Sequence, residues 1–82
     1  MAVHYRVERR GRELVLHHPG GGRFEVRRTT AVGILDFAWI GPDGAPGQVV
    51  RGTVNGFLVG QPDVGRSGGA RQALRAFAYG AP

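Results

Sequence analysis

The stretch AVGILDFAWI, residues 31–40, is the most apolar run of the chain and contains its only tryptophan. In a strand of this sequence Leu35, Phe37 and Trp39 share one face, and Asp36 alone interrupts the apolar residues of the other. A helix is the rival assignment, but the glycine, the β-branched residues and the alternating aromatic side chains favour a strand. Two apolar faces must be covered by the rest of the fold, by a second copy of the chain or by a partner protein. We therefore predict a central strand and a candidate interface made of Leu35, Phe37, Trp39 and Ile40.

Strict alternation of apolar and polar residues predicts three strands before this stretch, at residues 3–9, 13–18 and 23–28. A two-residue type II′ turn that begins at Gly11 sets Arg10 opposite Glu13 as a favourable pair, and we prefer this register to one that begins at Arg10. Residues 1–28 are thus expected to form a three-stranded meander. Its outer face carries arginines and glutamates in balance, which indicates cross-strand ion pairs.

The second half of the chain is predicted to contain a hairpin and a helix. Asn55-Gly56 lies between apolar runs, which is a strong hairpin signal, so residues 48–54 and 57–60 are expected to pair. A helix is expected over residues 66–79, with Ser67 as its N-cap.

These elements predict one domain, residues 1–82, in the mostly β (α+β) class. It comprises the meander of residues 1–28, the central strand plus hairpin of residues 29–60, and the helix of residues 66–79. The expected architecture is a small antiparallel curved sheet or partly open barrel of about six strands, with one C-terminal helix packed against it.

The composition restricts the class of protein further. The chain has no cysteine, which excludes disulfides and thiolate zinc sites. We expect a cytoplasmic protein without a membrane partner, because the N-terminus lacks a signal-peptide core and no apolar run could span a bilayer. All 11 basic residues are arginine and the net charge is +5. Either a GC-rich genome explains this bias, or arginine was retained because its planar guanidinium binds phosphate.

The arginines outside the balanced meander face are the candidate nucleic-acid-binding residues: Arg9, Arg10, Arg12, Arg28, Arg66, Arg71 and Arg75. If the first hairpin tip and the C-terminal helix lie on one side of the fold, these side chains form a patch able to bind the phosphates of DNA or RNA. Solvated arginines without a partner are the alternative. Tyr79 is the one good candidate for a stacking aromatic, so backbone contacts are favoured over base reading.

Two further patterns could support chemistry. Residues 65–69 fit the G-x-S-x-G pattern of a nucleophilic serine, but an antiparallel chain of 82 residues lacks the parallel sheet that this mechanism needs, and a helix cap explains Ser67 better. His4, His17 and His18 could approach one another, with Glu25 as a fourth metal ligand. The preferred register, however, sets a cation, Arg6, opposite His17.

Asp36 needs a partner on so apolar a strand, and Arg51 is the candidate, unless the carboxylate is exposed at a sheet edge.

We accordingly predict no catalytic residue, metal or cofactor, and a small basic, non-enzymatic protein that binds nucleic-acid phosphates through arginine clusters. The alternative is a structural, assembly or protein–protein interaction module, such as a phage or virion component or a homo-oligomer. A third hypothesis is a small enzyme or toxin that uses histidine and arginine.

Overall fold

A computed structural model of the chain describes residues 3–80; the predicted domain of residues 1–82 includes four terminal residues, 1–2 and 81–82, that lie outside this range. One antiparallel sheet has the strand order β1-β2-β3-β4-β5. The strands are β1 (Arg6–Arg10), β2 (Glu13–His17), β3 (Arg23–Arg28), β4 (Ile34–Ile40) and β5 (Pro46–Thr53). The helices are α1 (Val54–Gly60), α2 (Pro62–Arg66) and α3 (Gly68–Tyr79).

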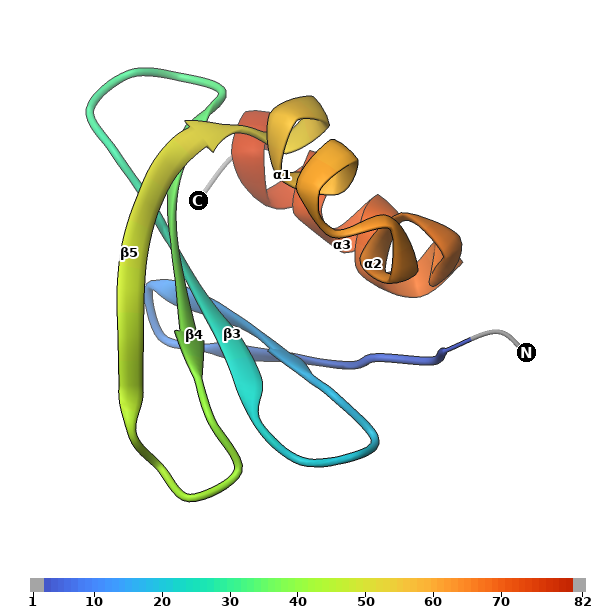
Figure 1. Cartoon of the computed structure of the whole chain (residues 1–82). Helices are drawn as coiled ribbons and strands as arrows, with labels where there is room; N and C mark the ends of the chain where they lie inside the picture. The colour runs from blue at the N-terminus through green and yellow to red at the C-terminus, as the bar shows by residue number, and fades with distance from the viewer. Residues whose placement is uncertain (1–2, 81–82) are drawn as a thin grey trace.

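The sheet is curved and unclosed, and the three helices lie together on its concave side (Figure 1). The predicted class, mostly β (α+β) with a curved antiparallel sheet and C-terminal helical structure, is confirmed. The core lies between the helices and one face of the sheet. Its members from the strands are Leu14, Leu16, Phe24, Val26, Leu35 and Phe37, and those from α3 are Ala70, Leu74, Phe77 and Ala78.

The predicted register of the first hairpin is confirmed. Arg10 pairs with Glu13. Gly11 has φ of 59°, and no residue other than glycine has positive φ within residues 3–80, as a turn with glycine in its first position requires.

The central strand begins later than predicted, at Ile34 instead of residue 31. Gly33 adopts φ of 83°, a left-handed conformation outside the regular strand region, and the Tyr79 ring lies 2.9 Å from the place that a β-carbon on Gly33 would occupy. Thr29 closes the preceding turn, because its hydroxyl accepts a hydrogen bond from the Ala31 amide and donates to the Ile34 carbonyl.

The predicted hairpin across Asn55-Gly56 is wrong, so the sheet has five strands, not six. Residues 54–60 form α1, whose N-cap is Thr53; the Thr53 hydroxyl accepts a hydrogen bond from the Gly56 amide at 3.0 Å. A helix places Val54 and Phe57 on one face, whereas a strand would place them on opposite faces. Both side chains therefore reach the core in the helical form, where Phe57 stacks on Phe37 with ring centroids 4.0 Å apart.

Two further segments differ from expectation. The helix expected over residues 66–79 is replaced by two: residues 62–66 form the short helix α2, which buries Val64, and α3 begins at Gly68. Ser67 occupies the N-cap position of α3, but its hydroxyl makes no capping bond. Instead it is buried and accepts a hydrogen bond from the Tyr5 amide at 3.1 Å, which fastens the start of the chain to the α2–α3 junction.

The four residues predicted as an interface lie mostly inside the protein. Leu35 and Phe37 are buried beneath the helices, and Ile40 is buried as well. Trp39 alone among them is partly exposed. The opposite face of β4 has no covering layer within residues 3–80; it carries the Asp36 side chain in an ion pair with Arg51.

Candidate functional site

The face of the sheet turned away from the helices carries most of the acidic side chains, and these pair with arginines. The four ion pairs are Arg10–Glu8 at 3.1 Å, Arg23–Glu25 at 2.7 Å, Arg27–Glu13 at 2.6 Å and Arg51–Asp36 at 2.8 Å. The predicted pairing of Asp36 with Arg51 is thereby confirmed, although the pair is exposed on the open face and not buried. The Arg51 hydrogen bond lowers the pKa of Asp36, so this carboxylate stays ionised.

One row of this open face alternates in charge across all five strands. The strand register places Arg10, Glu13, Arg27, Asp36 and Arg51 opposite one another in that order. We call this row the charge ladder. Its charges largely cancel, and it offers little attraction to a polyanion.

Seven of the eleven arginines have no carboxylate partner within residues 3–80, and three of them lie together. Arg9, Arg12 and Arg28 line a hollow of about 690 Å³ beside the β1–β2 turn, which we call the tip hollow. Its remaining walls are Glu13 and Arg27, which pair with each other. The tip hollow therefore has three guanidinium groups whose charge nothing in its lining neutralises.

Phe77 of α3 positions two of these groups. The guanidinium carbons of Arg9 and Arg28 lie 4.9 Å and 4.4 Å from the centroid of the buried Phe77 ring, within the range of a cation–π interaction. Each arginine also donates from Nε to a backbone carbonyl, Arg9 to Gly11 and Arg28 to Phe77. The terminal nitrogens make no hydrogen bond within residues 3–80 and can donate to a ligand.

The other predicted residues do not join this cluster. Arg10 projects from the opposite face of β1 and pairs with Glu8. Arg71 and Arg75 donate to the Gly65 carbonyl and to Asn55, on the side of α3 that faces α1 and α2.

The position of these two arginines on α3 explains the separation. Positions 75 and 77 of a helix are about 200° apart, so Arg75 lies across α3 from the tip hollow. Arg66 is exposed at the end of α2. The predicted single patch is thus divided: Arg9, Arg12 and Arg28 lie at the tip hollow, Arg71 and Arg75 lie on α3, and Arg10 and Arg66 belong to neither group.

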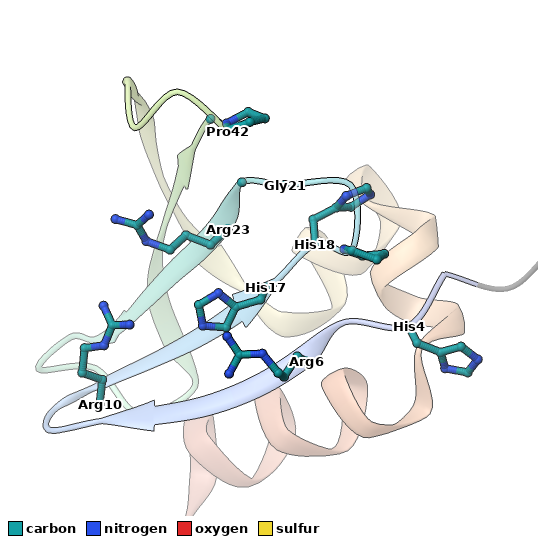
Figure 2. Close-up of a pocket in the computed structure, with 11 residues that line it drawn as sticks. His4, Arg6, Arg10, His17, His18, Gly21, Arg23 and Pro42 are labelled. Atoms are coloured by element: carbon teal, nitrogen blue, oxygen red, sulfur yellow. The ribbon is translucent and has the colours of Figure 1, made fainter.

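A second hollow, of about 650 Å³, lies at the other end of the open face (Figure 2). We call it the loop hollow because the β2–β3 and β4–β5 loops contribute Pro19, Gly21, Gly22, Gly41 and Pro42 to its lining. Its basic side chains include Arg6, Arg10, His17 and Arg23. The sequence pattern does not indicate this site, although the preferred register of the first hairpin sets Arg6 opposite His17.

The histidines do not converge on one point. His4 projects away from the others in Figure 2. The His17 Nε2 atom is 2.7 Å from a Glu8 carboxylate oxygen, and His18 Nδ1 accepts a hydrogen bond from the Gly20 amide. No group of three or more metal-ligating side chains is assembled within residues 3–80.

Aromatic side chains line a third, smaller hollow on the helix side. Tyr5, His18, Phe24 and Trp39 contribute, with Gln61 and Asp63 at its polar end, and its volume is about 390 Å³. The Tyr5 hydroxyl donates to Asp63 at 2.7 Å; burial and this hydrogen bond raise the pKa of Tyr5, so the phenol stays protonated. Tyr79, the predicted stacking residue, is exposed but packs over Gly33 at the opposite end of β4.

Comparison with protein-family models, with curated proteins and with solved structures finds no match to this chain. Within residues 3–80, no helix has the length and apolar character needed to cross a membrane.

Proposed function

We propose that this protein is a non-enzymatic nucleic-acid-binding protein of the cytoplasm, and that Arg9, Arg12 and Arg28 contact phosphates of the DNA or RNA backbone. The observation that supports the proposal is the tip hollow itself, in which these three guanidinium groups meet without a neutralising carboxylate. Guanidinium groups bind phosphate oxygens through paired N–H donors. The Phe77 ring holds two of them in place, which lowers the entropy lost when a phosphate binds.

The expected mode of binding is independent of base sequence. No base-reading helix or ribbon is required, because the contacts are to phosphate and the net charge of +5 favours association with any polyanion. Each phosphate contact releases counterions, so three contacts correspond to a log–log salt slope of about −2 to −3.

Fluorescence anisotropy of labelled random DNA and RNA, titrated at about 50 and about 200 mM salt, tests this proposal. The Arg9→Gln/Arg12→Gln double variant is expected to bind at least tenfold more weakly and to lose about 2 units of the salt slope. Arg71→Gln/Arg75→Gln is the matched control, since it removes the same charge from the other side of α3.

Equal losses in the two double variants would contradict a localised site and indicate attraction by net charge alone. Salt-insensitive binding, or no binding at low salt, would overturn the proposal altogether.

A second candidate function is self-assembly, which the edge strand β5 favours. Its outer edge has no partner strand within residues 3–80, and Val49 and Val50 are exposed on its two faces. Unpaired edges with apolar side chains are templates for strand addition. Sedimentation equilibrium over a range of concentrations is the test: an oligomer that Val50→Lys dissociates supports this function, and a monomer throughout contradicts it.

A further inference from the structure

The loop hollow contains a row of basic side chains. The register places Arg6 opposite His17 and His17 opposite Arg23, so three basic side chains form one row across β1, β2 and β3. In the row of Arg10, Glu13 and Arg27 the same strands set opposite charges against each other, whereas the row of Arg6, His17 and Arg23 contains no acidic residue. A local exception of this kind is a mark of a functional site.

Two glutamates in the neighbouring row of the sheet hold His17 and Arg23 in position. Glu8 accepts a hydrogen bond at 2.7 Å in its contact with His17, and Glu25 accepts one from Arg23 Nε at 2.7 Å. The His17 and Arg10 hydrogen bonds lower the pKa of Glu8, which therefore stays anionic. Neither glutamate lines the hollow, although both lie on the same face of the sheet; the arginines in its lining are Arg6, Arg10 and Arg23.

Donors remain available for a ligand. Arg23 uses only Nε in its ion pair, so both terminal nitrogens are free of hydrogen bonds within residues 3–80. Arg6 is exposed and makes no hydrogen bond or ion pair in that range. The two arginines are two strands apart, about 10 Å between their α-carbons, a span that two long side chains can close over one small anion above His17.

Two loops give the hollow a wall on one side. Gly21 and Gly22 both have positive φ, 103° and 80°. A β-carbon on Gly21 would lie 3.1 Å from Pro42, and one on Gly22 would lie 2.6 Å from the Trp39 ring. The β2–β3 loop therefore packs against the β4–β5 loop and against the only tryptophan. A ligand whose charge lies at one end can therefore enter beside this wall. An internal segment of a nucleic-acid strand, which continues on both sides of each phosphate, fits less well.

We infer that the loop hollow binds a phosphomonoester, with Arg6 and Arg23 as its principal ligands. A terminal phosphate carries a charge of about −2 near neutral pH and three free oxygens, which match two guanidinium groups and a positive surround. A volume of about 650 Å³ is in the range of small-molecule sites, so a nucleotide or the 5′-phosphate end of a nucleic-acid strand can enter. This inference goes beyond the proposed function, because the loop hollow and the tip hollow share no residue.

Titration of Trp39 fluorescence tests the inference, since the Trp39 ring contacts Gly22 in the wall of the hollow. The probes are inorganic phosphate, adenosine 5′-monophosphate and dimethyl phosphate, a diester. Saturable binding of the first two, with the diester at least tenfold weaker, is expected. A 5′-phosphorylated oligothymidylate and its 5′-hydroxyl counterpart then distinguish a strand end from a free nucleotide as the source of the phosphate.

Arg6→Gln is expected to weaken phosphomonoester binding about tenfold or more, because a charged hydrogen bond is lost. Arg66→Gln is the matched control; it removes the same charge at the exposed end of α2, outside both hollows, and should leave phosphomonoester binding unchanged. Equal effects of the two variants, equal binding of the diester, or the absence of a saturable signal would each overturn the inference. None of these results depends on the Arg9→Gln/Arg12→Gln experiment, so the two proposals fail separately.

Discussion

Phe77→Leu is the substitution that tests how the core supports the tip hollow. Leucine keeps an apolar side chain at a buried position of α3, and the change of shape costs about 1 kcal/mol. The ring that stands 4.9 Å and 4.4 Å from the Arg9 and Arg28 guanidinium carbons is lost, and each cation–π interaction contributes about 0.5 to 1 kcal/mol. The expected destabilisation is about 2 to 3 kcal/mol, a large part of the roughly 4 to 12 kcal/mol available to a chain of this length.

Urea unfolding, followed by Trp39 fluorescence, measures this loss, and a double-mutant cycle with Arg9→Gln isolates the interaction. A coupling free energy of about 0.5 to 1 kcal/mol between Phe77 and Arg9 is expected. Affinity for nucleic acid should also fall in Phe77→Leu, although no charge is removed, because the guanidinium groups lose their fixed orientation. Additive effects in the cycle, together with unchanged affinity, would refute the argument that Phe77 organises the tip hollow.

Three other predictions concern stability. Arg6→Gln should not lower the melting temperature while it weakens phosphomonoester binding, because Arg6 makes no hydrogen bond or ion pair within residues 3–80 and the chain carries a net charge of +5; a lower melting temperature would show that Arg6 contributes to the fold. Thr53→Ala should lower the free energy of unfolding by about 1 kcal/mol, since α1 loses its cap, and Thr53→Ser should restore most of it in the same urea assay. The pKa of Asp36 is lower in the folded state than in the unfolded chain. The ionised Asp36 side chain therefore contributes to the free energy of unfolding above the unfolded pKa, near 4, and this contribution is lost as the pH falls through the lower folded pKa. Asp36→Asn should therefore reduce the acid dependence of the urea midpoint below about pH 4, and an unchanged pH profile would show that the Arg51 pair does not contribute.

The parts of the fold that the sequence could predict are those fixed by local pattern. Alternation and a single turn glycine define the first hairpin, so the pairing of Arg10 with Glu13 followed from neighbouring residues alone. The hairpin prediction at Asn55-Gly56 was wrong because the conformation of this segment depends on tertiary packing. Phe57 stacks on Phe37 only if a helix begins at Val54. Local turn preference is too weak to compete with the burial of two apolar side chains.

The sequence could predict which arginines belong to the candidate site, but not which of them lie together in the folded protein. Arg9, Arg12 and Arg28 were identified from charge, yet what assembles two of them is Phe77, which lies 49 residues from Arg28 in the chain. The loop hollow required the registers of β1, β2 and β3 together. The β2–β3 turn is rich in glycine, so its geometry, and with it the position of Arg23, was not fixed by the sequence pattern.

The charge ladder also bears on how this chain finds its native pairing during folding. A slip of one residue between strands would turn the core side chains outward, so burial prevents it, but a slip of two residues keeps every side chain on its own face. A two-residue slip in one direction would place Glu13 opposite Glu25, and the same slip between β3 and β4 would place Glu25 opposite Asp36. The opposite slip would separate the ladder's pairs. Misaligned intermediates are therefore raised in free energy at the stage when the strands first meet, so side chains that add little to native stability still decide which alignment the chain keeps.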